Sequence, residues 1–231
     1  GVDPVIGDRA MNEVRVEQPL LDDTNREAAA SRQRYDEASV LCLNLMSSPG
    51  AGKTSLLECT LERLHGSPRL GIVEGDIQGA LDAERLARLG APVRQINTHG
   101  ACHLDPRQVI AEAAAMGLDE LDVLVIENVG NLVCPAEFDL GEHARVMLLS
   151  VPEGHDKPAK YPLMFRTSDV LLINKIDLVP YTNFDVAEAT RLARGLNPRL
   201  EVFEISCRTG EGLDRWLDWL RARVAAQGEV T

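Results

Sequence analysis

Short apolar segments recur along this chain and alternate with longer stretches in which polar and apolar residues are mixed. Seven segments have the length of buried strands; they begin at residue 41 and continue at 70–74, 93–97, 123–126, 146–151, 170–173 and 202–206. The stretches between them favour helices, the clearest being 55–61, 106–116, 185–196 and 212–226. Strands that are apolar on successive positions indicate a sheet covered on both faces. The pattern therefore predicts an α/β fold with a mostly parallel sheet and helices on both faces.

The first strand runs into a glycine-rich turn and then into a helix, through the sequence Ser47-Ser48-Pro49-Gly50-Ala51-Gly52-Lys53-Thr54. This order is that of a P-loop, in which backbone N–H groups and a helix N-terminus surround phosphates. We expect Lys53 to reach the β- and γ-phosphates and Thr54 to hold Mg²⁺. Ser47 stands where the P-loop consensus has its first glycine, and the alternative is an ordinary glycine-rich turn. The predicted phosphate-binding residues are Pro49, Gly50, Ala51, Gly52, Lys53, Thr54 and Ser55.

Two later strand ends carry residues suited to a guanine base. Asn174-Lys175-Ile176-Asp177 matches the N-K-x-D pattern. The Asp177 carboxylate can accept hydrogen bonds from both the ring N–H and the exocyclic amine of guanine, whereas adenine would leave it unpaired. Ser206, Cys207 and Arg208 follow the last strand, where they can close over the base. The sequence therefore predicts GTP and GDP, rather than ATP, as the nucleotides.

Two further strand ends lie between these motifs. Glu127 follows a buried strand where a Walker-B acid would stand, and it can act on Mg²⁺ through water. The Gly130 N–H can contact the γ-phosphate. Asp76 lies in a glycine-flanked loop at the switch I position, where it can bind Mg²⁺ or orient the attacking water. The alternative for Asp76 is a capping residue of the helix that follows. Lys53, Asp76 and Gly130 are thus the predicted catalytic residues.

The charge and composition of the chain exclude some classes of binding partner. The 231 residues carry a formal net charge of −12, which argues against nucleic acid and anionic membranes as partners. No apolar run reaches membrane-span length, and five widely spaced cysteines do not form a disulfide pattern, so a cytoplasmic location is expected. Residues 1–10 precede Met11 and can be a vector-derived remnant; we expect 1–36 to be an extension, helical and weakly packed or disordered, before a domain of 37–231.

Three residues on loops at the ligand edge are candidate ligands for Ni²⁺ or Zn²⁺: Cys102, His103 and Cys134. Thiolate and imidazole suit these metals, and Cys102-His103 precedes a helix start at Asp105-Pro106, where a thiol is readily ionised. The alternative is that the cysteines fill apolar space. Adjacent residues on regular backbone point apart, so Cys102 and His103 would not easily share one ion. Two copies meeting across an axis would pool their ligands, which predicts a homodimer in the GTP state.

Together these motifs resemble the hydrogenase nickel-incorporation GTPases of the HypB family, within the SIMIBI class of P-loop proteins. The resemblance covers roughly residues 35–220 and rests on the P-loop with its leading serine and on the segments 74–78, 102–105, 127–135, 150–162 and 174–177. It implies slow Mg²⁺-dependent GTP hydrolysis, nucleotide-dependent dimerisation and delivery of Ni²⁺ to [NiFe] hydrogenase. It also implies metal ligation by Cys102, His103 and Cys134 at the dimer interface. A nickel-handling accessory protein and the hydrogenase large subunit are the implied partners.

Two other functions stay open on the sequence. One is a GTPase chaperone for another metallocentre or cofactor enzyme, of the urease or cobalamin type. The other is a nucleotide-gated scaffold in which Cys102 and Cys134 are structural. Lys157 and Lys160, on a loop rich in glycine and proline, are candidates to reach the nucleotide or a partner, although loop lysines are usually solvated.

Overall fold

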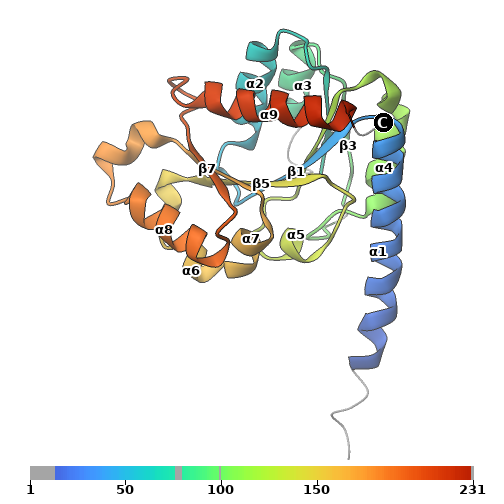
Figure 1. Cartoon of the computed structure of the whole chain (residues 1–231), viewed down its shortest axis with the longest axis horizontal. Coiled ribbons are helices and arrows are strands. Elements are labelled where there is room, and N and C mark those ends of the chain that lie inside the picture. Colours follow the sequence, from blue (N-terminus) through green and yellow to red (C-terminus); the bar gives the residue numbers. More distant parts are fainter. Residues whose placement is uncertain (1–13, 76–79, 99, 230–231) are drawn as a thin grey trace, which may run out of the picture.

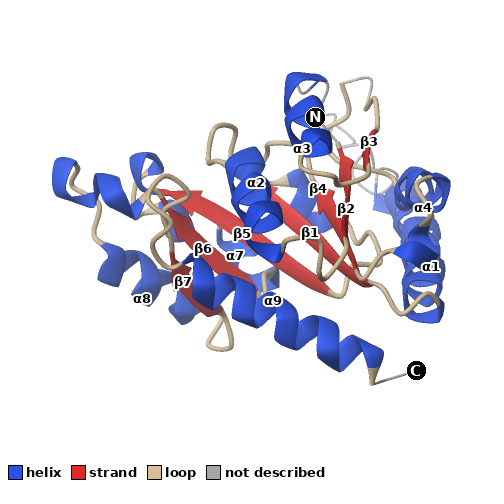
Figure 2. Cartoon of the chain, turned by 90° about the horizontal axis from the view of Figure 1, so that it is seen from above, coloured by secondary structure: helices blue, strands red, loops and turns tan. Residues whose placement is uncertain are grey.

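The computed structural model describes residues 14–75, 80–98 and 100–229. Its centre is a sheet of seven strands in the order β3-β2-β4-β1-β5-β6-β7, shown in Figures 1 and 2. Every pairing is parallel. The expected mostly parallel sheet is therefore confirmed, and within the described residues it is parallel throughout. The strands are β1 (Leu41–Ser47), β2 (Leu70–Glu74), β3 (Val93–Gln95), β4 (Val123–Glu127), β5 (Ala144–Ser150), β6 (Val170–Asn174) and β7 (Glu201–Glu204).

Helices cover both faces of this sheet. The α-helices are α1 (Val14–Glu37), α2 (Lys53–Leu64), α3 (Ala80–Arg88), α4 (Pro106–Ala115), α5 (Cys134–Glu137), α6 (Lys157–Lys160), α7 (Pro162–Thr167), α8 (Val186–Leu196) and α9 (Leu213–Gly228). The short helices α5, α6 and α7 were not predicted, because four to six residues are too few to show a helical period.

Successive side chains of the central strand β1 point to opposite faces, as strand geometry requires. Leu41, Leu43 and Leu45 pack in one core with α2, α3 and α9. Cys42 faces the other side and packs with α1 and α4, while Met46 packs with α5, α7 and α8. The strand is buried at all seven positions, which explains why its sequence is continuously apolar rather than alternating.

The N-terminal helix α1 packs more firmly than its polar sequence suggests. Ala28, Ser31 and Tyr35 form a narrow stripe along one side of it, and each is at most 3% exposed. This stripe lies against α4 and the turn before β5. A Cβ on Gly141 would come within 2.5 Å of the Ala28 carbonyl oxygen, so the helix needs a glycine at this crossing. The predicted weak packing is therefore corrected from Ala28 onwards.

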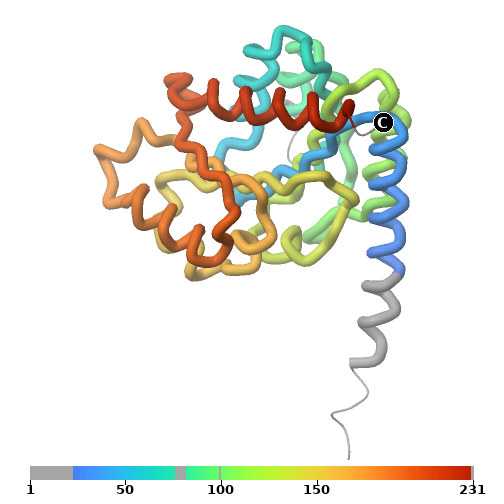
Figure 3. Tube along the Cα trace, in the orientation of Figure 1, coloured from blue at the N-terminus to red at the C-terminus, as the bar shows by residue number. Residues whose placement is uncertain are grey.

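Helices α1 and α9 meet at one partly buried histidine. His143 Nδ1 accepts a hydrogen bond from the Cys42 N–H at 2.9 Å, so its Nε2 carries the proton and faces Asp36 Oδ1 at 2.8 Å. Gln227, near the end of α9, donates to the same Asp36 oxygen at 2.9 Å. Figure 3 shows the end of α9 lying close to the end of α1. Burial lowers the pKa of His143 and outweighs the hydrogen bond with Asp36, which raises it; the charges of Arg32 and Arg223 lower it further.

We predict that this histidine makes stability depend on pH. Protonating Nδ1 removes the acceptor for Cys42 N–H, and the pKa of His143 is lower in the folded protein than in the unfolded chain. Unfolded His143 therefore takes up protons first, and stability falls as the pH drops below about 6.5 towards the folded pKa. Thermal unfolding followed by circular dichroism between pH 7.5 and 5 measures this loss.

A His143→Asn variant keeps an acceptor but cannot titrate, so its melting temperature should depend less steeply on pH. His65→Asn is the matched control. His65 is exposed, caps α2 in the left-handed region at φ 50°, and tolerates asparagine there. Equal pH dependence in His143→Asn and the unmodified protein would contradict the assignment.

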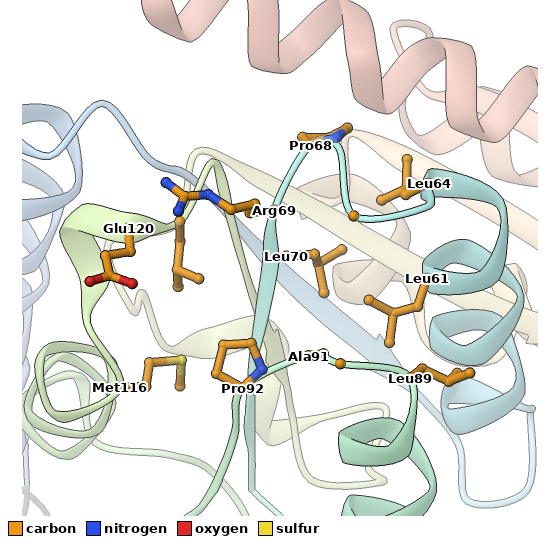
Figure 4. Close-up of a pocket in the computed structure, with 13 residues that line it drawn as sticks. Leu61, Leu64, Pro68, Arg69, Leu70, Leu89, Ala91, Pro92, Met116 and Glu120 are labelled. Atoms are coloured by element: carbon orange, nitrogen blue, oxygen red, sulfur yellow. The ribbon is translucent and has the colours of Figure 1, made fainter.

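One cavity, of about 240 Å³, lies beside the start of β2 and the residues just before β3. Leucines 61, 64, 70 and 89 form much of its apolar wall, and Arg69 and Glu120 stand at its edge (Figure 4). It is at the amino ends of these strands. Ligands of parallel sheets bind beyond the carboxyl ends, so the nucleotide site is expected at the opposite edge.

No helix among the described residues is both long and apolar enough to span a membrane.

Candidate nucleotide and metal sites

The P-loop lies between the end of β1 and the start of α2. Gly52 precedes the helix at φ 107°, and a Cβ there would lie 2.6 Å from Asn174 Nδ2, so only glycine fits. Lys53 is 8% exposed. Its Nζ donates to Ser47 Oγ at 3.1 Å and lies 4.0 Å from Glu127 Oε1. Ser47, in place of the consensus glycine, therefore helps to hold the lysine over the loop.

A cavity of about 360 Å³ opens above this loop. Acidic residues from three elements line it: Glu74 at the end of β2, Asp82 on α3 and Glu127 at the end of β4. Thr54 Oγ1 donates to Asp82 Oδ2 at 3.0 Å. Hydroxyl and carboxylate oxygens are the ligands that Mg²⁺ prefers, so the donor set beside the phosphate loop fits this ion.

Two of these acidic residues were missed by the sequence analysis. Glu74 appeared only as the first residue of the family-like segment 74–78, with no role of its own, and Asp82 lies in the first turn of an amphipathic helix without a recognisable motif. Arg85, which also lines the cavity, binds Glu58 Oε2 at 2.6 Å and Asp82 Oδ1 at 3.2 Å. The predicted magnesium or water-orienting residue Asp76 lies outside the described residues.

Gly130 lies directly against the P-loop. A Cβ on it would be 3.1 Å from Pro49 Cγ and 3.3 Å from Pro49 N, so the backbone here approaches the loop more closely than most residues allow. The sequence predicted that the Gly130 N–H contacts the γ-phosphate, and the close approach to Pro49 is compatible with that role.

The predicted guanine residues surround a second cavity, of about 280 Å³, on the other side of the P-loop. Asn174 Nδ2 donates to the Ala51 carbonyl at 3.0 Å, and Lys175 Nζ donates to the Gly50 carbonyl at 2.7 Å. Lys175 has a φ of 65°, which turns its stem back over the P-loop. The cavity is lined by Gly52, Ser55, Asn174, Lys175, Asp177, Leu178, Cys207 and Arg208.

The carboxylate of Asp177 is held from one side. Ser206 Oγ donates to its Oδ1 at 2.7 Å, and Arg208 lies 3.8 Å from its Oδ2. Cys207 N–H donates to Asn174 Oδ1 at 3.3 Å, which ties the loop after β7 to the loop after β6. Burial raises the pKa of the Cys207 thiol to about 12, so this cysteine is a packing residue rather than a reactive one.

Two pairwise contacts link the three predicted metal ligands, one between Cys102 and His103 and one between Cys102 and Cys134. Cys102 Sγ lies 3.7 Å from His103 Nδ1. The expectation that these neighbours point apart is therefore wrong, because they lie on irregular backbone between β3 and α4 rather than on a regular element. The pKa of the Cys134 thiol is raised, first by its hydrogen bond with Cys102 and then by burial. No cluster of three or more His, Cys, Asp or Glu side chains disposed to hold a metal occurs among the described residues.

One aromatic residue, Phe138, and one polar residue, Asn131, contact the candidate metal ligands, and neither contact was predicted. The His103 ring stacks on Phe138 with centroids 3.8 Å apart and an angle of 8° between the rings. Asn131 Oδ1 accepts from Val133 N–H at 2.8 Å, and its side chain also bonds the Cys134 thiol. The stacking can be seen only in three dimensions, because 35 positions separate the two rings in the sequence.

The two candidate loop lysines lie on the short helix α6. Lys160 Nζ pairs with Asp156 at 2.6 Å, and Lys157 lies 5.3 Å from the centre of the Tyr161 ring. Within the single chain, both therefore make local contacts.

Comparison with known proteins decides the family. Residues 41–204 match the CobW/HypB/UreG nucleotide-binding domain. The hydrogenase maturation factor HypB of Escherichia coli (strain K12) is 48% identical over 223 residues, which are 96% of this chain and 76% of that protein. The chain belongs to the HypB family of hydrogenase maturation factors. The resemblance noted in the sequence is thus confirmed, and nucleotide binding follows from the domain.

Solved structures of HypB proteins share the fold. The crystal structure of HypB from Archaeoglobus fulgidus matches with a TM-score of 0.84 and 37% identity, over 88% of this chain and 100% of that one. HypB from Helicobacter pylori, crystallised in complex with nickel, matches with a TM-score of 0.83 and 37% identity, over 88% and 96%. The P-loop α/β architecture predicted from the sequence is therefore that of the HypB family.

Proposed function

We propose that this HypB protein is a GTP-hydrolysing metallochaperone that binds Ni²⁺ and delivers it during [NiFe] hydrogenase maturation. The observation that carries the proposal is a pair of hydrogen bonds that join the end of β6 and the loop after it to the P-loop. Asn174 and Lys175 both bond carbonyls of the P-loop, at Ala51 and Gly50. These bonds join the phosphate residues to the guanine residues, which supports a single nucleotide site in which Asp177 selects guanine.

The phosphate half of the site supports slow hydrolysis. Lys53 would neutralise charge on the β- and γ-phosphates, and Gly130 would sense the γ-phosphate. Thr54, Asp82 and Glu127 would hold Mg²⁺, which supplies charge neutralisation between the phosphates. Asp76 is proposed as a further magnesium or water-orienting residue on the basis of its sequence position alone.

The second part of the proposal concerns Ni²⁺, the metal ion that the protein would deliver. Cys102, His103 and Cys134 offer two thiols and an imidazole, a set that suits Ni²⁺ or Zn²⁺. Three ligands leave coordination positions open, and a second copy of the chain in the GTP state would supply more of them. The nickel complex of the Helicobacter pylori relative supports Ni²⁺ as the metal. All five cysteines are free thiols, which suits a reducing cytoplasm.

We expect the Cys102→Ala/Cys134→Ala double variant to lose Ni²⁺ binding while it retains GTP binding, because neither thiol lies in the nucleotide cavities. Calorimetric titration with Ni²⁺ measures this, with Cys59→Ala as the matched control, since Cys59 faces Cys207 instead. Light scattering with a GTP analogue and Ni²⁺ tests the dimer. Unchanged nickel affinity in the double variant, or a persistent monomer, would contradict the proposal.

A cellular experiment separates this function from the alternatives. Expression in a strain that lacks its own HypB should restore hydrogenase activity, whereas the double variant should not. Restoration of urease alone would favour a chaperone for a different metallocentre. Full activity of the double variant would favour a nucleotide-gated scaffold with structural cysteines.

A further inference from the structure

A chain of polar side chains crosses the interior of the protein between the proposed nucleotide and metal sites. Asn128, just after β4, donates from Nδ2 to Asn44 Oδ1 on β1 at 3.1 Å. Asn44 Nδ2 in turn donates to Glu142 Oε1 at 3.1 Å. Asn44 is fully buried, and Asn128 and Glu142 are 2% and 5% exposed. These three side chains form a continuous hydrogen-bonded path below the sheet edge.

At one end the path reaches the loop that approaches the P-loop. Asn128 Oδ1 accepts from the Val129 N–H at 2.9 Å, and the Asn128 N–H donates to the Leu45 carbonyl at 3.0 Å. Val129 precedes Gly130, which packs against Pro49. Because Val129 adjoins Gly130, a shift of Gly130 towards a γ-phosphate would reach the Asn128 side chain through the Val129 N–H.

At the other end the path holds the segment that carries a metal ligand. Arg145 donates from Nε to Glu142 Oε1 at 2.6 Å. Its two terminal nitrogens donate to the carbonyls of Ala136 and Phe138, each at 3.1 Å. The Leu140 N–H donates to the second Glu142 oxygen at 2.7 Å. Three backbone groups within residues 136–140 are thus fixed by one buried ion pair.

This segment positions two of the candidate ligands. Ala136 lies in α5, which begins at Cys134. The Phe138 ring stacks on the His103 imidazole. The guanidinium of Arg145 therefore fixes the backbone next to both ligand groups, although it does not itself touch them in the described structure.

The Glu142–Arg145 ion pair has a buried carboxylate and a partly buried guanidinium, and stability alone is a weak explanation for it. Apolar residues of similar volume often stabilise a fold as well as or better than a buried ion pair. Burial raises the pKa of the Glu142 carboxyl, so the interior opposes its charge. In a network where each member bonds the next, the bonds polarise one another, and such networks are one of the physical routes by which two sites can be coupled.

We infer that Asn44, Glu142 and Arg145 are positioning residues that couple nucleotide state to the geometry of the Cys102, His103 and Cys134 group. The inference rests on the proposed function for its meaning. Contact of Gly130 with a γ-phosphate displaces Asn128, and the displacement passes through Asn44 and Glu142 to Arg145. The carbonyls that Arg145 holds then move α5 and the Phe138 ring.

The test measures the rate of thiol alkylation in protein that is free of Ni²⁺ and Zn²⁺. Iodoacetamide labelling of Cys134, followed by mass spectrometry, is timed with GDP and with a non-hydrolysable GTP analogue at saturation. We expect the two rates to differ by about fivefold or more, a typical coupling between sites. Asn44→Leu cuts the path at its middle, and Arg145→Lys keeps the charge but cannot bond both carbonyls and Glu142. In each variant the ratio of the two rates should fall to within about twofold.

Arg94→Lys is the matched control, because Arg94 also bonds a helix carbonyl, that of Ala115 at the far end of α4. It should keep the ratio of the unmodified protein. A merely structural role would change both rates together and leave their ratio intact, so a persistent ratio in both path variants overturns the inference. Equal rates in the unmodified protein overturn it as well. Failure of the unmodified protein to bind Ni²⁺ would instead overturn the proposed function, while the metal-free ratio still tests the path.

Discussion

Replacement of Lys53 by alanine is expected to abolish measurable GTP hydrolysis. The lysine is buried beside Ser47 and Glu127, and it lines the cavity above the P-loop. Removing a group that stabilises charge in the transition state typically lowers kcat by about 10²- to 10³-fold. Because the expected unmodified rate is already slow, such a loss takes the variant below detection. Release of inorganic phosphate under single-turnover conditions measures it.

The matched control is Lys160→Ala, which removes a lysine that pairs with Asp156 on the surface of α6. In the monomer this variant should hydrolyse GTP at the unmodified rate. Circular dichroism shows whether Lys53→Ala remains folded. Hydrolysis by a folded Lys53→Ala protein within threefold of the unmodified rate would contradict the assignment of the phosphate site.

Replacement of Asp177 by asparagine should weaken GTP binding and change base preference. The carboxylate can accept from two guanine N–H groups, and hydrogen bonds to a charged group each contribute about 1.5–3 kcal/mol. Asparagine offers one acceptor oxygen and turns an amide N–H₂ donor towards the other guanine N–H donor, so affinity should fall by about 10²-fold or more. Xanthine has a carbonyl where guanine has its amine, and the new amide can donate to it.

Fluorescence titration with labelled GDP and XDP measures both effects. Asp218→Asn, an exposed substitution on α9, is the control and should bind like the unmodified protein. The Asp177→Asn variant should prefer XDP over GDP. Equal GDP affinity in variant and unmodified protein would show that another residue selects the base.

Motifs contained in one short segment could be predicted from the sequence. The P-loop and the Asn174-Lys175-Ile176-Asp177 segment each place their residues by local backbone geometry, and the structure brings both to one site. Alternation of strands and helices likewise predicted the parallel sheet, because buried parallel strands must be apolar on both faces.

Features that depend on distant elements could not be predicted in this way. Asp82 meets Thr54 only because α3 packs beside α2, and Phe138 meets His103 only because two loops converge. The pairing of Cys102 with His103 was misjudged because irregular backbone does not follow helix or strand periodicity. The packing of α1 was underestimated because small residues such as Ala28 and Ser31 make a stripe without strong hydrophobicity.

The order of strands in the sheet has a consequence for synthesis of the chain. Strand β1 is made first but lies in the middle, where its neighbours β4 and β5 come from much later in the sequence. The base pocket needs Asp177 and Arg208, which emerge from the ribosome later still. A nascent chain that ends before residue 208 therefore displays the P-loop without a complete guanine pocket. Guanine-selective binding during translation is therefore expected only once the chain has been made through residue 208.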